Sequence, residues 1–372
     1  MKNVIIITLD ALRRDRLNLC NNLKEFEKKS FFFSNMITNS PYTMASFHTL
    51  HTGMHPSKNG VNGYYRMFRF KKNICKTLSQ YLKEKNYYCV SDVVNKCLLP
   101  EQGFDEVMVH KKNIDMFLRQ KELIKELIKK EPFFLHIQYS PIHNRLVKEV
   151  AEKYDDFSEE YFGNIKKNIQ RYEGFVKECN EYVGKMNRLF EELKLFDNSI
   201  IIYHSDHGTS VGEKVGEKIY GVFTYDYTVK SFCYLYAPNI KTSKTRVQCR
   251  IIDIMPTILR MLNIPEDFSF ITMQGKSLIP IIKEKEKKDR VAFIETGGIK
   301  GPWPSPEEHN VFCVRHDDKK LICNKTPSTW EFYDLEKDPE EKNNIYAKND
   351  SIIKKYKEEL KEIMFENKNY GL

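Results

Sequence analysis

The sequence predicts an α/β protein with a mostly parallel central sheet flanked by helices. Two apolar, β-branched runs at residues 4–9 and 199–204 carry this prediction, because each has the length and composition of a strand buried on both faces. An acidic residue follows each run, Asp10 directly after the first and Asp206 shortly after the second. Strand-like and helix-like segments then alternate along most of the chain, which is typical of parallel sheets with crossover helices.

The main part of the chain is expected to contain six strands and six helices. The expected strands lie at residues 4–9, 31–37, 88–94, 133–139, 199–204 and 231–236. The expected helices lie at residues 23–29, 44–53, 78–85, 114–130, 165–195 and 252–262. The longest of them repeats apolar residues at helical spacing, so we expect it to pack along the sheet.

The pattern changes after about residue 288. Four short strands are expected at residues 291–294, 311–315, 320–323 and 330–333, followed by a polar helix at 350–365. This pattern predicts a small C-terminal antiparallel sheet with a helix. The Lys- and Glu-rich stretch 283–290 is the expected junction, so we divide the chain into a catalytic α/β domain, residues 1–288, and a small α+β subdomain, residues 289–372.

Composition narrows the class of protein. The 372 residues are 41% hydrophobic and 30% charged, as in soluble globular proteins. The net charge of +9 comes from lysines spread along helical patterns without nucleic-acid-reading motifs, so no nucleic-acid partner is expected. Nine scattered cysteines favour a reducing compartment. No stretch approaches the roughly 20 apolar residues of a membrane span, so we expect a cytoplasmic protein with no membrane anchor.

Two carboxylates and a histidine are expected to meet at one edge of the sheet. Asp10 and Asp206-His207 follow buried strands, and open α/β folds bind their ligands at the carboxyl ends of such strands. These residue types predict a metal site. Thr43 lies at the N-terminus of the helix expected at residues 44–53, where free backbone N–H groups favour an anion. A hydroxyl there, beside a divalent cation, is a candidate nucleophile, although threonine is also a common helix cap.

Motifs along nearly the whole chain resemble, in order, those of the sulfatase family of the alkaline phosphatase superfamily. They lie at residues 7–17, 43–53, 56–61, 103–105, 132–143, 205–208, 253–257, 275–278 and 333–339. The resemblance implies an alkaline-phosphatase-like fold. It also implies that Asp10, Thr43, Asp206 and His207 bind one divalent metal ion. Three oxygen ligands and one imidazole suit Mn²⁺ or Zn²⁺, with Mg²⁺ or Ca²⁺ as the alternatives.

The chain departs from the family pattern at the nucleophile. Sulfatases of the formylglycine type have Cys or Ser followed by x-Pro-Ser-Arg, whereas this chain has Thr43 and, in place of the arginine, Phe47. The usual aspartate pair on the first strand is reduced to Asp10-Ala11. Because threonine cannot mature to formylglycine, the resemblance favours relatives with an unmodified threonine. We therefore predict a metal-dependent hydrolase or transferase that cleaves a phosphate mono- or diester through a covalent threonine intermediate.

Other residues are candidates for contact with the substrate. His143 is expected to act as general acid or to bind substrate, with a hydrogen-bonded loop histidine as the alternative. Lys214 and Lys218 are expected to bind the anionic group, with a solvated charged loop as the alternative. Five aromatic residues are expected near the site, with packing as their alternative role: Tyr42, Phe47, Tyr64, Tyr65 and Trp303.

Two other functions remain open. The first is a sulfate-ester hydrolase acting on a small or glycan substrate, and the second is a non-catalytic scaffold that binds metal. In either catalytic case the expected partner is an anionic ester that is a small molecule or is linked to a glycan or lipid.

Overall fold

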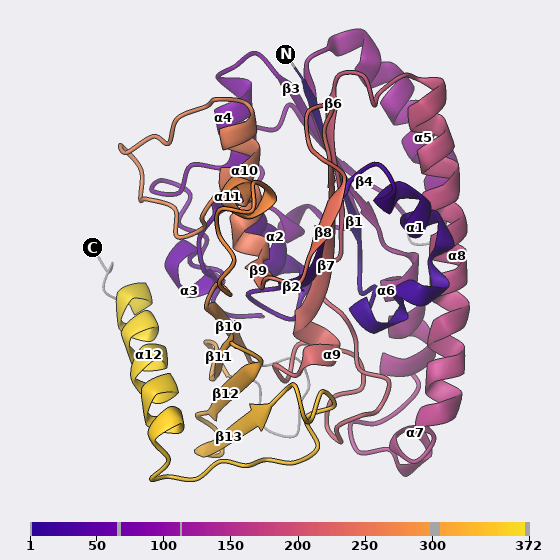
Figure 1. The fold of residues 1–372 in the computed structure, drawn as a ribbon. Helices are drawn as coiled ribbons and strands as arrows, with labels where there is room; N and C mark the ends of the chain where they lie inside the picture. The colour runs from indigo at the N-terminus through magenta and orange to yellow at the C-terminus, as the bar shows by residue number, and fades with distance from the viewer. Residues whose placement is uncertain (1, 65–67, 112–113, 298–305, 369–372) are drawn as a thin grey trace.

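The computed structural model describes residues 2–64, 68–111, 114–297 and 306–368. A large central sheet lies between two layers of helices, and a second, smaller sheet packs below it against one long helix (Figure 1). The predicted fold class is confirmed: the central sheet is mostly parallel, and the small C-terminal sheet is antiparallel.

Nine strands of the described chain form the central sheet. They are β1 (Asn3–Leu9), β2 (Phe31–Ile37), β3 (Tyr88–Val93), β4 (Glu106–Val109), β5 (Phe133–Tyr139), β6 (Ser199–His204), β7 (Lys230–Tyr236), β8 (Ser243–Thr245) and β9 (Cys249–Arg250). The order is β4-β3-β5-β1-β6-β7-β2-β8, and β9 pairs with β2. The strands β5, β1 and β6 therefore lie side by side and parallel at the centre, which brings their carboxyl ends to one edge.

Strand β7 runs antiparallel to both of its neighbours. The chain between β6 and β7 stays at the carboxyl edge of the sheet and includes only one short helix, α9 (Asp226–Val229). The Gly208 N–H donates to the Thr228 carbonyl at 2.7 Å, so the beginning and the end of this connection are hydrogen-bonded to each other. Since no helix carries the chain back to the other edge, β7 must begin where β6 ends.

Alternating residues of the central strands face two separate cores. Ile5, Ile7 and Leu9 of β1 pack on one side, and Val4 and Ile6 pack on the other. One side is covered by α1 (Asn21–Glu27), α5 (Met116–Leu127), α6 (Pro141–Leu146) and α8 (Ile165–Glu192). The other side is covered by α2 (Thr43–Thr52), α4 (Leu78–Lys83), α10 (Ile254–Met261) and α11 (Ile279–Ile282). Two further short helices are α3 (Pro56–Asn59) and α7 (Glu159–Phe162).

The small sheet has the order β10-β11-β12-β13 and is antiparallel throughout. Its strands are β10 (Ala292–Thr296), β11 (Val311–His316), β12 (Lys319–Asn324) and β13 (Thr329–Asp334). One face is covered by α12 (Ser351–Lys368), through Ile353, Tyr356 and Leu360. The other face packs on the end of the central sheet, so the small sheet lies beside the carboxyl edge.

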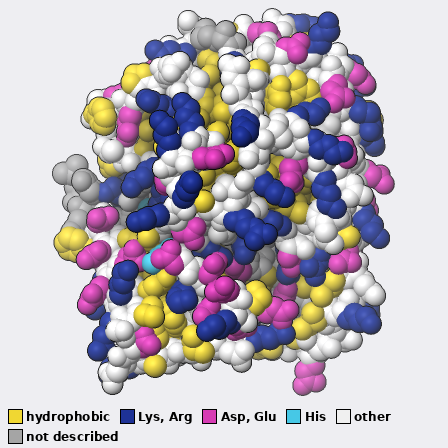
Figure 2. Space-filling model, viewed as in Figure 1, with side chains coloured by type: hydrophobic (Ala, Val, Ile, Leu, Met, Phe, Trp, Pro, Cys, Tyr) yellow, Lys and Arg dark blue, Asp and Glu magenta, His cyan; other side chains and the backbone are white. Residues whose placement is uncertain are grey.

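Two surface properties bear on the partners expected for this chain. Among the described residues, no helix combines the length and the apolarity that crossing a membrane requires. Figure 2 shows lysine and arginine side chains interspersed with acidic ones over the face in view.

Candidate active site

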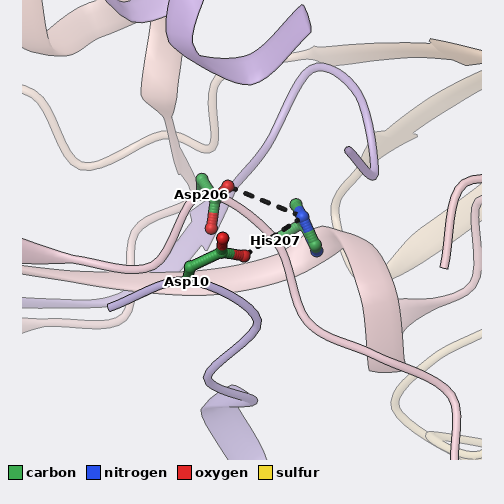
Figure 3. A group of neighbouring side chains, drawn as sticks. All are labelled: Asp10, Asp206 and His207. Carbon is green, nitrogen blue, oxygen red and sulfur yellow. Dashed lines mark ion pairs between the residues drawn. The ribbon is translucent and has the colours of Figure 1, made fainter. Parts of the chain in front are cut away.

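Asp10, Asp206 and His207 form a buried cluster at the carboxyl edge of the central sheet (Figure 3). Asp10 directly follows β1, and Asp206 and His207 follow β6, its parallel neighbour. Nε2 of His207 lies 3.7 Å from Oδ1 of Asp10 and 3.5 Å from Oδ2 of Asp206. All three side chains are 0% exposed. The structure thus brings together the three residues that the sequence predicted to meet.

His207 has a defined orientation. Its Nδ1 lies 2.7 Å from the carbonyl oxygen of Gly208. Because a carbonyl only accepts hydrogen bonds, Nδ1 carries a proton, so that in the neutral tautomer the lone pair is on Nε2, the nitrogen that faces the cluster. A second hydrogen bond of this kind commonly orients a metal-binding histidine.

The chemistry of the cluster fits a divalent cation. Oδ1 of Asp10 and Oδ2 of Asp206 are buried without a hydrogen-bond partner among the described residues. Burial, and next the Asp206 carboxylate, raise the pKa of Asp10 well above its usual range. Two buried carboxylates and an imidazole lone pair converge at distances too long for hydrogen bonds, so a bound cation would satisfy all three.

The Thr43 hydroxyl joins this cluster. The helix α2 begins at Thr43, one residue earlier than expected, and the capping position belongs to Tyr42, whose side chain makes no cap. Oγ1 of Thr43 lies 3.2 Å from Nε2 of His207. The helix ends at Gly53, whose φ of 64° is easily adopted by glycine. The four residues expected to hold one metal therefore lie together.

Each carboxylate also has a neutral hydrogen-bond donor, which is a side-chain amide for Asp10 and a backbone N–H for Asp206. Gln138, near the end of β5, donates from Nε2 to Oδ2 of Asp10 at 2.7 Å. The Ala11 N–H lies 3.4 Å from Oδ1 of Asp206, and Ala11 has a φ of 59°, a costly value for alanine. Sequence reasoning missed Gln138. Its signal was an amide near the carboxyl end of an expected strand rich in apolar residues.

A pocket of about 330 Å³ opens onto the cluster. Its described lining is mostly aromatic, apolar or neutral: Asp10, Tyr42, Thr43, Met44, Tyr64, Val94, Asn95, Cys97, Leu98, Gln138, His143, Asn144 and Tyr220. No lysine or arginine belongs to this part of the lining.

His143 lies in the pocket wall, on α6. Its Nδ1 is 3.7 Å from Oδ2 of Asp10 and 3.1 Å from the Tyr220 hydroxyl. The Tyr220 ring in turn packs against the His207 ring, with centroids 4.4 Å apart. His143 can thus reach a substrate held over the cluster. Tyr220, for which the sequence predicted no role, contacts both His143 and His207.

The two candidate lysines face other partners. The Lys214 ammonium donates to the Glu341 carbonyl at 2.6 Å and lies over the Tyr225 ring. The Lys218 ammonium donates to the Tyr154 carbonyl at 2.6 Å and pairs with Asp156. Neither residue belongs to the pocket lining, so the structure does not bring them to the cluster.

The aromatic candidates divide into three groups. Tyr42 and Tyr64 line the pocket, with ring centroids 5.1 Å apart. Phe47 is buried in the core against His136. Tyr65 and Trp303 lie outside the described residues.

The fold and this cluster define an alkaline-phosphatase-like α/β protein with a buried candidate metal site. The family profile described as "Sulfatase" matches residues 2–264, and this chain belongs to that family. A second profile, "N-sulphoglucosamine sulphohydrolase, C-terminal", matches residues 222–368. Members of the sulfatase family generally bind a divalent metal.

Known proteins support this assignment. An N-acetylglucosamine-6-O-sulfatase of Bacteroides thetaiotaomicron is 26% identical over 256 residues, which cover 62% of this chain and 43% of that protein. A protein solved in complex with its substrate, D-glucosamine-2-N,6-O-disulfate, superposes with a TM-score of 0.77 and 18% identity, covering 99% and 98% of the two chains. The phosphonate monoester hydrolase of Agrobacterium radiobacter has a TM-score of 0.78 and 16% identity, covering 99% and 96%. The matched region spans less than half of the first curated relative's length.

Proposed function

We propose that this chain is a metal-dependent hydrolase that cleaves a sulfate ester on a small or glycan substrate. The observation that carries the proposal is the convergence of Thr43 Oγ1 with Asp10, Asp206 and His207 at one end of the pocket. This replaces the phosphate ester as the first choice, because the relatives are named for sulfate esters. We keep the division into a catalytic domain, residues 1–288, and a subdomain, residues 289–372, as part of the proposal.

Asp10, Asp206, His207 and Thr43 would hold one divalent cation. Such an ion neutralises charge on a non-bridging oxygen of the ester and favours the alkoxide form of a neighbouring hydroxyl. The imidazole ligand favours Mn²⁺ or Zn²⁺ over Ca²⁺ and Mg²⁺. Gln138 would hold Asp10 in the geometry of a ligand.

The chain's own residues account for the bond changes. Oγ1 of Thr43 attacks sulfur while its proton passes to Asp10, with which Thr43 is hydrogen-bonded. The ester oxygen–sulfur bond breaks, and His143 donates a proton to the departing alcohol. Water then attacks sulfur, the bond from sulfur to Oγ1 breaks, and one proton of the water passes to Oγ1, so that Thr43 is restored and hydrogen sulfate leaves. The proton held by Asp10 returns to His143, whose Nδ1 lies 3.7 Å from Oδ2 of Asp10.

The substrate class follows from pocket size and from the relatives. A volume of about 330 Å³ lies at the lower end of the range for small-molecule sites. The relatives include a sulfatase named for N-acetylglucosamine and a structure with a disulfated glucosamine. We therefore propose a single sulfated sugar ring as the group that occupies the pocket.

A second candidate is hydrolysis of a phosphate mono- or diester. Thr43 favours it, because a threonine cannot become formylglycine and a sulfated threonine lacks the geminal hydroxyl through which a formylglycine adduct collapses. A phosphothreonine is released by attack of water at phosphorus, so the same residues would suffice.

One set of assays separates these candidates. The purified protein is freed of metal and supplied with Mn²⁺, Zn²⁺, Ca²⁺ or Mg²⁺. Turnover is then measured on glucosamine 6-sulfate, p-nitrophenyl sulfate, p-nitrophenyl phosphate and bis-p-nitrophenyl phosphate. Thr43→Ala and Thr43→Ser are tested beside the wild type, because serine keeps the hydroxyl and alanine removes it.

We expect turnover of the sulfate esters with a divalent cation and a loss of about a thousandfold or more in Thr43→Ala. Thr43→Ser should retain turnover within about tenfold of the wild type. Turnover confined to the phosphate esters would replace the proposal by the second candidate. Cation binding without turnover of any ester would instead favour the metal-binding scaffold.

A further inference from the structure

Tyr42, the residue directly before Thr43, is hydrogen-bonded to the small C-terminal sheet. Its hydroxyl lies 2.6 Å from Nε2 of His309, and Nδ1 of His309 lies 3.0 Å from Oε2 of Glu295 on β10. The three side chains are almost completely buried, with exposures of 0% for Tyr42, 1% for His309 and 0% for Glu295. They form a continuous chain from β10 to the first turn of α2.

The Glu295 carboxylate is the acceptor at one end of this chain. Glu295 also accepts from the backbone N–H and the hydroxyl of Ser57. Burial raises the pKa of Glu295, but the hydrogen bonds from His309 and Ser57 outweigh it and lower the pKa below its usual value. The carboxylate therefore accepts and Nδ1 of His309 donates, which leaves Nε2 of the same ring to bond the Tyr42 hydroxyl. A charge-assisted bond thus fixes the imidazole that holds Tyr42.

The strand β10 is bonded to two segments that carry pocket residues. The Glu295 N–H donates to the Asn39 carbonyl at 3.0 Å, in the segment that leads to Thr43. The Thr296 hydroxyl donates to the Gly221 carbonyl at 2.7 Å, directly after Tyr220. A single strand of the small sheet is therefore bonded to the segment that carries the nucleophile and to the loop that carries Tyr220.

We propose that Glu295, His309 and Tyr42 form a positioning relay through which the small sheet fixes the first turn of α2, and with it the direction of the Thr43 hydroxyl. Tyr42 is bonded at its hydroxyl, packs its ring against Tyr64 and forms part of the pocket wall. Its carbonyl accepts the Ser46 N–H of the first helical turn at 3.1 Å. A change at His309 is thereby transmitted to α2. The catalytic consequence rests on the proposed function, in which Thr43 is the nucleophile.

The test compares two buried histidines of the same subdomain. His309→Gln breaks the relay. His316→Gln is the matched control, because His316 also bonds a carboxylate, Glu359, but faces α12 and not the pocket. Tyr42→Phe keeps the ring and removes only the hydroxyl. Hydrogen–deuterium exchange is measured on peptides covering residues 40–50, together with kcat and KM on the best ester substrate.

We expect His309→Gln and Tyr42→Phe to raise exchange in residues 40–50 about fivefold or more, with no such change in His316→Gln. In the two relay variants kcat should fall about tenfold, while KM stays within about twofold of the wild type. An effect of this size is typical when a residue that orients a metal ligand is lost, and Thr43 is such a ligand in the proposed function. The double variant should resemble either single variant, because both remove the same interaction.

Unchanged exchange in residues 40–50 of both relay variants would overturn the relay, whatever the activity. So would a rise of equal size in His316→Gln, since the effect would then be a general loss of stability. Absence of turnover in the wild type would overturn the proposed function only, because the exchange measurement reads the relay without any substrate.

Discussion

Gln138 is the neutral side chain on which the Asp10 carboxylate depends. Its Nε2 donates to Oδ2 of Asp10 at 2.7 Å, and its Oε1 accepts the Val94 N–H at 3.0 Å. Gln138 is fully buried, so neither bond can be replaced by water without a change of structure. The amide thus ties a cluster carboxylate to a loop of the pocket wall.

Gln138→Leu should weaken cation binding at the cluster by about tenfold or more, because an unsupported ligand loses its orientation. It should also lower the free energy of unfolding by about 1–3 kcal/mol, since the Val94 N–H is left unpaired. Titration calorimetry with Mn²⁺ or Zn²⁺ measures the first effect and chemical denaturation the second. Gln248→Leu is the matched control, because Gln248 is equally buried but bonds Arg290 and Arg315. If both variants keep the cation affinity of the wild type, Gln138 has no part in the cluster.

The positions of the cluster residues can be predicted from local sequence. The residues that hydrogen-bond to the site cannot be predicted in this way. Asp10, Asp206 and His207 come after buried strands, and parallel strands that are neighbours end at the same edge, so strand recognition was enough. Gln138 and His309 act through contacts set by the packing of distant segments. Lys214 and Lys218 have the right charge and lie in the right loop, but the direction of a side chain in an irregular loop cannot be read from sequence.

At the scale of single elements, α12 is held to the small sheet partly by an ionisable contact. The ring of His316 stacks on Tyr356 of α12 at 4.3 Å, and its Nε2 lies 2.8 Å from Oε2 of Glu359. Burial lowers the pKa of His316, but the bonds to Glu359 and Asp317 outweigh it, and the net pKa is raised. His316 therefore binds its proton more tightly in the folded state than in the unfolded state.

This contact predicts that docking of α12 weakens as pH rises. A raised pKa in the folded state gives stabilisation that is complete below the ordinary histidine pKa of about 6.5 and is lost as pH passes the raised value. Hydrogen exchange of residues 351–368 should accordingly be faster at pH 8.5 than at pH 6 after correction for intrinsic rates. Glu359→Gln should reduce this difference, and Glu358→Gln, at an exposed neighbour, should leave it unchanged. An identical pH response in Glu359→Gln would contradict the assignment.

The loop between β6 and α9 contains a second ionisable contact. Glu217 is fully buried and accepts hydrogen bonds from the Val222 and Phe223 N–H groups and from the Tyr227 hydroxyl. Burial, as the largest cause, raises the pKa of this carboxyl to about 7. The folded state therefore holds a proton that the unfolded state loses at lower pH.

Glu217→Gln should flatten the dependence of stability on pH. In the wild type the raised pKa makes the free energy of unfolding fall as pH rises from about 4.5 to about 7, by on the order of 3 kcal/mol. The glutamine keeps an acceptor for the two N–H groups and has no charge to bury. Denaturation at pH 5 and pH 8 measures the difference, with Glu340→Gln as an exposed control. A wild-type slope retained in Glu217→Gln would exclude Glu217 as its source.

The elements that sequence reasoning placed correctly are those with strong local patterns. Strands β1, β5 and β6 are fully buried and rich in apolar residues, and α8 repeats buried residues at helical spacing. The strands that were missed, β4, β8 and β9, have two to four residues and lie toward the edges of the sheet. Their strand conformation comes from pairing with neighbours and not from their own composition. The direction of β7 depends on the path of the preceding loop, which carries no periodic signal.

For the molecule as a whole, the cluster joins elements that are distant in sequence. Asp10 follows β1, Asp206 and His207 follow β6, and Thr43 opens α2. Without a cation, the two buried carboxylates repel each other or one of them must be protonated. A cation that binds only the folded arrangement should therefore stabilise the entire catalytic domain.

Chelation should lower the melting temperature, and saturating divalent cation should restore it. At a free cation concentration of about 100 times Kd the gain is about 2.7 kcal/mol, which for a chain of 372 residues corresponds to about 3 °C. Asp206→Asn is the decisive variant, because it removes one ligand charge and also the repulsion. Its metal-free form should melt at or above the temperature of the metal-free wild type, and added cation should shift it little. A cation-induced shift as large as that of the wild type would mean that the stabilising ion binds elsewhere, and the cluster would lose its role as the metal site.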